Sequence, residues 1–196
     1  ITVLGDVLNI GTPSDGTVSL AKLSATGTKD ATTFLRGDNT FDTPAGGVNT
    51  PAFEAYTNAS QSITEATYTK MTMATEVFDI DSAYDNVTNY RFTPQTAGKY
   101  FCYAKGESDP SSYENEMIIS MQFYFNNAGL GYTTSEVMTG GNTSTDGSTA
   151  TTLTISNIIE FNGSTDYLEV FFHLNTWSNS GATVKSKVFG AYRIIE

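Results

Sequence analysis

The stretch that decides the fold is Tyr84–Gly106, YDNVTNYRFTPQTAGKYFCYAKG, in which two aromatic runs flank a turn at residues 94–98. After the turn the apolar side chains alternate, and successive side chains of a strand point to opposite faces of its sheet. The two faces carry Tyr100, Cys102 and Ala104 on one side, and Phe101 and Tyr103 on the other. Both sets are apolar, so the pattern predicts a strand that is buried on both faces.

Neighbouring segments repeat this period of two. Residues 117–125 alternate strictly and lead into a hairpin turn at residues 126–129, and a period of two over such a length excludes a helix. In residues 68–81 the apolar parity switches, which predicts a bulge or a change of sheet. Further strands are predicted at Leu153–Phe161, Tyr167–Leu174 and Val184–Ile195, with a polar loop over residues 134–151. Turn signals recur about every ten residues, as in a β-sandwich.

The composition agrees with an all-β domain and excludes several partners. Only 16% of the 196 residues are charged and 12% are aromatic, a balance that favours strands over salt-bridged helices. The net charge of −11 disfavours binding to nucleic acid or to anionic membranes. No apolar run reaches the length of roughly 18 to 20 residues that crosses a bilayer, so membrane insertion is not expected. Cys102 is the only cysteine, which leaves no intrachain disulfide and no zinc-site spacing.

Residues 53–196 resemble a C1q/TNF-type domain through landmarks in a fixed order. In the deciding stretch the matching residues are Tyr84, Asp85, Phe92, Pro94, Gly98, Tyr100 and Phe101. The segments FYFNNAG, STDYLEVFFHL and KSKVFGAYRIIE follow in the same order as in that family. The last segment departs from the family pattern, because Val188 stands where the family has phenylalanine and Phe189 adjoins Gly190. The resemblance implies a jelly roll that assembles as a homotrimer, with aromatic side chains on the inner face of each protomer.

The N-terminal segment carries a second resemblance. TTFLRGDNTFDTP, residues 32–44, is similar to a segment found in many bacteriophage tail-fibre proteins, with Asn39 in place of glycine and Phe41 in place of tryptophan. In that setting Arg-Gly-Asp is a turn between aromatic anchors, not an integrin-binding signal. We therefore expect residues 1–50 to form a collar or shaft and residues 51–196 a C1q-like knob. The side chains expected to pack between chains are Phe34, Leu35, Arg36, Phe41, Tyr100, Phe123, Phe125, Phe189 and Tyr192.

Candidate binding residues lie in two polar loops, and no catalytic set is expected. The contact candidates are Thr139, Asn142, Asp146, Trp177 and Asn179, chosen because polar loops and an exposed tryptophan often contact partners. Asp79, Asp81 and Asp85 form the densest acidic cluster and are weak candidates for calcium, against a solvated strand end. His173 is the only histidine and lies in a predicted strand, without a nucleophile motif. No cofactor is expected.

The leading hypothesis is a homotrimeric virion fibre protein of a bacteriophage, located on the particle surface as a tail or head fibre. It would attach the particle to a host-surface glycan or protein, and its N-terminal segment would bind other virion proteins. One alternative is a secreted C1q/TNF-like or spore-surface binding protein, which would carry a signal peptide and often a Gly-x-y stalk, features not seen in these residues. Another alternative is a polysaccharide-degrading spike, with a pair of carboxylates in a groove.

Overall fold

The computed structural model describes residues 24–44, 49–110, 116–140, 151–176 and 182–194. Contacts divide the chain into two compact units, Ile1–Gly47 and Val48–Glu196. In the first unit, the strands β1 (Phe34–Leu35) and β2 (Phe41–Asp42) form an antiparallel hairpin. The second unit holds all the other strands that the described residues form. The described residues also include one short 3-10 helix, η2 (Gly131–Thr133), and none of them forms a helix long and apolar enough to cross a membrane.

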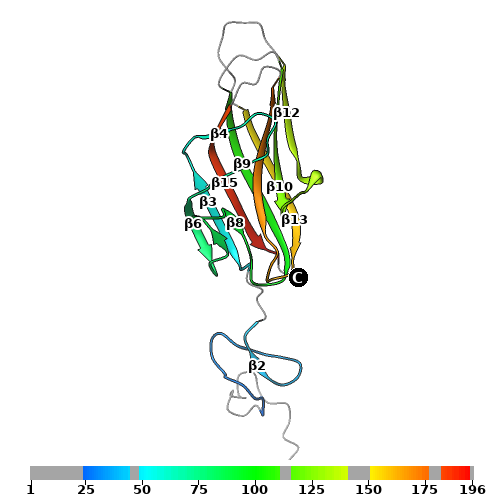
Figure 1. Ribbon diagram of the computed structural model, residues 1–196. Coiled ribbons are helices and arrows are strands. Elements are labelled where there is room, and N and C mark those ends of the chain that lie inside the picture. Colours follow the sequence, from blue (N-terminus) through cyan, green and yellow to red (C-terminus); the bar gives the residue numbers. More distant parts are fainter. Residues whose placement is uncertain (1–23, 45–48, 111–115, 141–150, 177–181, 195–196) are drawn as a thin grey trace, which may run out of the picture. The chain divides into compact units, whose positions relative to one another are not determined.

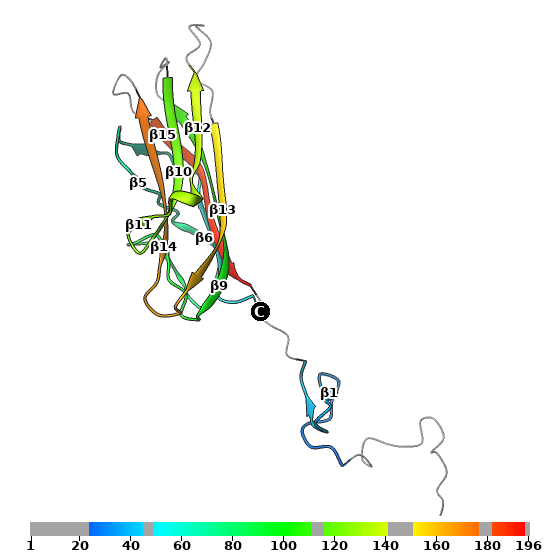
Figure 2. The same ribbon diagram turned by 90° about the vertical axis from the view of Figure 1, so that its right-hand side faces the viewer.

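The second unit is an all-β sandwich of two antiparallel sheets (Figures 1 and 2). The six-stranded sheet runs in the order β13-β9-β15-β3-β6, with β4 also paired to β15. Its strands are β3 (Ala52–Thr57), β4 (Gln61–Ile63), β6 (Thr75–Ile80), β9 (Gly98–Pro110), β13 (Thr151–Phe161) and β15 (Ala182–Arg193). The seven-stranded sheet runs in the order β11-β10-β14-β8-β7, with β12 also paired to β10 and β5 to β14. Its strands are β5 (Thr69–Lys70), β7 (Tyr84–Asp85), β8 (Arg91–Phe92), β10 (Glu116–Phe125), β11 (Ala128–Gly129), β12 (Ser135–Gly140) and β14 (Leu168–Thr176).

The strand pairing defines a jelly roll. Taking β3, β8, β9, β10, β12, β13, β14 and β15 as its eight positions, the first strand pairs with the eighth (β3 and β15) and the second with the seventh (β8 and β14). The third pairs with the sixth (β9 and β13) and the fourth with the fifth (β10 and β12). This nested order is that of an eight-stranded double-sheet jelly roll. The fold class predicted from the sequence is confirmed.

The core lies between the sheets and is rich in aromatic side chains. Phe53 on β3 stacks on Tyr84 and Phe92 of the opposite sheet, at centroid distances of 4.6 and 4.7 Å, and meets the edge of Phe189 at 4.9 Å. Cys102 is fully buried, and burial raises the pKa of its thiol. On β9 the parity predicted from the sequence is confirmed, because Tyr100, Cys102 and Ala104 face this core. A packed interior of this kind fixes the two sheets against each other.

Three local features depart from regular strand geometry. The chain passes from β5 in one sheet to β6 in the other, so the parity switch in residues 68–81 marks a change of sheet. Asn126 and Asn127 both have positive φ, at 50° and 66°, and make the tight turn between β10 and β11. In β15 a bulge between Lys185 and Val188 shifts the register, and this places Phe189 in the core next to Gly190.

Candidate functional site

The outward face of the six-stranded sheet carries a continuous row of apolar side chains. Ile158 lies opposite Phe101, Phe101 opposite Tyr192, Tyr192 opposite Ala52, and Ala52 opposite Ile80. We call these five residues the apolar band. Ile158 is 54% exposed within β13, and Tyr192 is 39% exposed near the end of β15. Ile80 is also 45% exposed, whereas Ala52, between Tyr192 and Ile80, is only 7% exposed. Exposed apolar side chains grouped in this way are typical of an interaction site.

The next row on the same face explains the glycine of the last strand. Tyr103 lies opposite Gly190 in register, and a Cβ at position 190 would come within 2.4 Å of the Tyr103 ring. The ring crosses over the glycine, so that its hydroxyl donates a hydrogen bond of 2.6 Å to Glu54 Oε2. Burial and this carboxylate both raise the pKa of the Tyr103 hydroxyl. Glu54 is therefore held by a hydrogen bond beside the apolar band.

The outward face of the seven-stranded sheet carries a separate group of rings. Tyr68 lies 4.5 Å from His173 and 5.5 Å from Tyr124, and Tyr124 lies 4.1 Å from Phe171, all between ring centroids. We call these four residues the aromatic cluster. His173 is half-buried on β14 with its ring against Tyr68, so the only histidine is part of this face.

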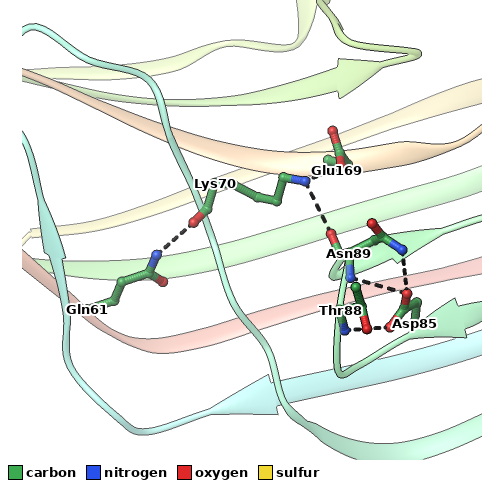
Figure 3. A network of polar contacts seen from close by, with 6 residues as sticks. All are labelled: Gln61, Lys70, Asp85, Thr88, Asn89 and Glu169. Atoms are coloured by element: carbon green, nitrogen blue, oxygen red, sulfur yellow. Dashed lines mark hydrogen bonds and ion pairs between the residues drawn. The ribbon is translucent and has the colours of Figure 1, made fainter.

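Figure 3 shows a network of polar contacts around Lys70. The Lys70 ammonium lies 6.0 Å from the ring centroid of Phe171, so the network borders the aromatic cluster. The Lys70 ammonium donates to Glu169 Oε1 at 2.6 Å and to the Asn89 carbonyl oxygen at 3.3 Å. Glu169 is only 2% exposed, and its second oxygen, Oε2, has no hydrogen-bond partner in the described part of the chain. A buried polar atom without a hydrogen-bond partner lowers the stability of the fold by about 1 to 3 kcal/mol. A hydrogen-bond donor that reached this oxygen would remove that cost.

The turn that presents the Asn89 carbonyl is organised by Asp85. Its carboxylate accepts hydrogen bonds from the backbone N–H groups of Val87, Thr88 and Asn89, and from the Asn89 side chain at 2.7 Å. The Thr88 N–H is the largest of the contributions that lower the pKa of Asp85, to about 2. Asp85 therefore stays ionised in all but strongly acidic solution and keeps the turn closed.

Asp79, Asp81 and Asp85, the weak calcium candidates, lie close to this turn in the sequence. Asp79 accepts from the backbone N–H groups of Ala83 and Tyr84, at 3.0 Å each, and Asp85 is saturated by its own turn. Asp81 is exposed and has a φ of 72°. Among the residues that the structure describes, no three acidic, histidine or cysteine side chains form a group that could hold a metal ion. Backbone donors occupy two of the three carboxylates, so the described residues give no support to the weak calcium candidates.

Gln61 joins the two sheets at a buried lysine. Its Oε1 accepts from Lys187 Nζ at 2.8 Å and from the Thr72 backbone N–H and hydroxyl at 3.1 Å each, while its Nε2 donates to the Lys70 carbonyl oxygen at 2.7 Å. Lys187 is 2% exposed, and no ion pair joins it to a carboxylate in the described residues. Burial lowers the pKa of its ammonium to about 8.

Replacing Lys187 with methionine is expected to stabilise the protein at pH 7 by about 1 to 2 kcal/mol. The folded-state pKa lies below the usual 10.5, so the folded chain binds fewer protons than the unfolded chain between pH 8 and 10.5. The wild type should therefore gain stability as the pH rises through this window. Urea unfolding at pH 7 and pH 9.5 should show this gain in the wild type and a smaller one in Lys187→Met. An equal pH dependence in both proteins would contradict the assignment.

The Arg-Gly-Asp segment forms the tip of the hairpin in the first unit. The Arg36 N–H donates to the Thr40 carbonyl oxygen at 2.8 Å, and Asn39 takes a positive φ of 63°, the conformation for which the family segment has glycine. Arg36 pairs with Asp42 at 3.0 Å. The Thr40 hydroxyl is the largest cause that lowers the pKa of Asp38. Both charges of the tripeptide are thus held within the hairpin.

The expected interchain residues fall into two groups. Phe34, Leu35 and Arg36 are exposed, Phe41 is half-buried, and Tyr192 belongs to the apolar band, so all five remain candidates. Tyr100, Phe123 and Phe189 are a correction, because each is 0% exposed within one chain and has no surface left for another. Phe125 packs against this core, with its ring 5.5 Å from Phe161.

The candidate contact loops are only partly described. Residues 135–140 form β12 along β10, whereas the sequence predicted a polar loop over residues 134–151, and Thr139 lies in this strand opposite Met117. The strand SEVMTG has only two apolar residues, Val137 and Met138, and they are adjacent, so its pattern does not alternate and the strand is hard to recognise without its partner. Asn142, Asp146, Trp177 and Asn179 lie outside the described residues.

Sequence reasoning missed most of both exposed faces. Ile80, Phe101 and Ile158 were not chosen as contact residues, and neither were Tyr68, Tyr124 and Phe171. The available signal was the outward parity of each strand, which in a sandwich with a solvated exterior should be polar. Apolar outward positions on several strands at once are the pattern that could have located both faces.

The structure defines the class as an all-β jelly-roll sandwich, with exposed apolar and aromatic side chains on the outward faces of its sheets. No protein-family model and no curated protein matches the sequence. Similar solved structures include the globular domain of zebrafish complement 1qA protein, with 14% identity, a TM-score of 0.42, and coverage of 74% of this chain and 98% of that chain. Another is the Eiger TNF from S. frugiperda, with 10% identity, a TM-score of 0.45, and coverage of 74% and 92%. These likenesses concern the fold alone.

Proposed function

We propose that this chain is a homotrimeric fibre protein on the surface of a bacteriophage particle, and that it attaches the particle to its host without a catalytic step. The sandwich serves as the knob, and the N-terminal unit serves as the collar that binds other virion proteins. The observation that best supports assembly into a trimer is the apolar band. Five strands place apolar side chains in one row on an outward face, and an identical face on each copy can be buried by closed rotational symmetry.

Charge supports assembly through this face. The chain has a net charge of −11, so most of its surface would repel a second copy. The band itself contains no ionisable group except the Tyr192 hydroxyl, and the adjacent Glu54 is hydrogen-bonded to Tyr103. On the band's other side, Glu160 lies opposite Lys99 in register, so opposite charges flank it. This outward face is therefore the part of the sandwich where copies meet at low electrostatic cost.

The hairpin supports the collar and the assignment to a virion. The segment that resembles phage tail fibres folds as a closed turn with exposed Phe34 and Leu35 beside it. Two exposed large apolar side chains on a two-stranded hairpin are typical of an element that needs neighbouring chains for stability. Three copies of such a hairpin would provide the attachment point for the rest of the fibre.

The proposed function is tested by measuring the mass of the purified protein and its location on phage particles. Light scattering of the purified chain should give three times the chain mass, and a monomer or dimer would overturn the trimer. Electron microscopy of phage particles labelled with antibody against the chain should place it on the particle, and the purified trimer should reduce phage adsorption to host cells. Absence from particles would overturn the virion assignment, and a trimer that leaves adsorption unchanged would overturn the attachment role.

A further inference from the structure

The aromatic cluster lies on the sheet that does not carry the apolar band, so assembly through the band leaves it accessible. Tyr68 is 43% exposed, and its ring bridges His173 on β14 and Tyr124 on β10. Phe171 is the fourth ring and lies on β14, which pairs with both β5 and β10. Four rings from three neighbouring segments thus form one half-exposed surface on the outward face of the seven-stranded sheet.

Polar groups border these rings on one side. Lys70 lies 6.0 Å from the Phe171 ring centroid, and its ammonium has one N–H left after its bonds to Glu169 and Asn89. About a third of the Lys70 side chain is exposed, whereas the Glu169 side chain is almost completely buried. Glu169 lies opposite Tyr124 in register, and its Oε2 has no partner among the described residues. The border therefore offers one accessible donor and one buried acceptor that lacks a donor.

The charges of this border select the chemistry of the ligand. Lys70 is paired with Glu169, and the guanidinium of Arg91 is balanced by the carboxylate of Asp85, which lies opposite it in register. No net positive field is left to attract an anionic ligand to a chain of net charge −11. A neutral ligand that combines C–H faces with hydroxyl groups matches both parts of the surface. The C–H faces pack against aromatic rings, and the hydroxyls both accept from an ammonium and donate to a carboxylate.

We propose that the aromatic cluster and the Lys70–Glu169 pair bind a neutral saccharide unit of a host-surface polysaccharide. This inference rests on the proposed attachment function, and it names the receptor class and the site. Tyr68 packs against the sugar ring, and the Lys70 ammonium donates to a sugar hydroxyl. A second hydroxyl donates to Glu169 Oε2 once the Lys70 side chain has shifted to admit it.

The test uses an array of neutral hexose and N-acetylhexosamine oligosaccharides, probed with the full chain and followed by calorimetric titration of the strongest binder. Tyr68→Ala should weaken binding by about tenfold, whereas Tyr68→Phe should retain it because the ring remains. Tyr132→Ala is the matched control, since Tyr132 is 73% exposed on η2 and is not part of the cluster. Thermal unfolding establishes that each variant is folded.

The outcomes separate this inference from the attachment role. Binding of a neutral saccharide that Tyr68→Ala weakens and Tyr132→Ala does not would support the site. If no neutral saccharide binds, or if Tyr68→Ala binds as well as the wild type, the site is overturned. In that case adsorption blocking by the same purified trimer would still uphold attachment through another surface. Saccharide binding without any blocking would support the site while overturning the attachment role.

Discussion

Replacing Tyr192 with glutamate is expected to convert the purified protein from a trimer to a monomer at micromolar concentration. Tyr192 is the central residue of the apolar band, between Phe101 and Ala52 in register. Each copy would bring one carboxylate into the buried face, and an unpaired buried charge costs about 2 to 5 kcal/mol. That cost corresponds to a rise of at least about 30-fold in the dissociation constant. Light scattering over a range of concentrations measures it.

The control for this change is Val87→Glu. Val87 is exposed in the turn after β7, so the same charge is added to each copy away from the band. The control should keep the mass of the wild type, and both variants should melt cooperatively. If Tyr192→Glu remains a trimer, the band does not form the interface. If Val87→Glu also dissociates, general charge repulsion is the cause, and the band loses its special role.

Much of the sandwich could be predicted from local sequence, because strand periodicity and turn chemistry are local properties. The alternation in residues 117–125 and the two asparagines after it are sufficient to define β10 and its turn to β11. The strands β13, β14 and β15 begin and end within about two residues of the expected bounds. In each case the information lies within one segment and does not depend on its neighbours.

The sequence did not determine which face of a strand points inward. Tyr100 and Phe101 are adjacent aromatic residues on β9, and periodicity separates them without saying which one enters the core. The structure buries Tyr100 against Phe92 and Phe161 and places Phe101 on the apolar band. Tyr100, Phe123 and Phe189 were therefore wrongly expected at the interface, while Phe101 was missed. The choice depends on long-range strand pairing, which a period of two does not encode.

The bulge in β15 is a second feature that could not be predicted from the local sequence. Val188 stands where the family pattern has phenylalanine, and the sequence alone gave no register for this strand. The structure inserts one extra residue between Lys185 and Val188, with Ser186 at a φ of 50°, and Phe189 then points into the core. Lys187 enters the interior as a consequence, where Gln61 is its hydrogen-bond partner. Neither the buried lysine nor its depressed pKa had a local signal.

Replacing Phe53 with alanine is expected to lower the free energy of unfolding by about 3 to 5 kcal/mol. Phe53 is fully buried and stacks on Tyr84 and Phe92 of the other sheet, so its removal leaves a cavity between the layers. The edge contact with Phe189 is lost as well. Urea unfolding at pH 7 measures the change. Tyr132→Ala, which removes an exposed ring of similar size, should cost less than about 1 kcal/mol.

The Phe53→Ala variant also distinguishes an effect on folding from an effect on assembly. Phe53 points inward, whereas its neighbours Ala52 and Glu54 lie on the outward face with the apolar band. The folded fraction of Phe53→Ala should therefore keep the mass of the wild type while unfolding at a lower urea concentration, the reverse of the result expected for Tyr192→Glu. If Phe53→Ala does not fold, Phe53→Leu, with an expected loss of about 1 to 2 kcal/mol, answers the same question. A loss no larger than that of Tyr132→Ala would show that the stacked rings do not hold the two sheets together.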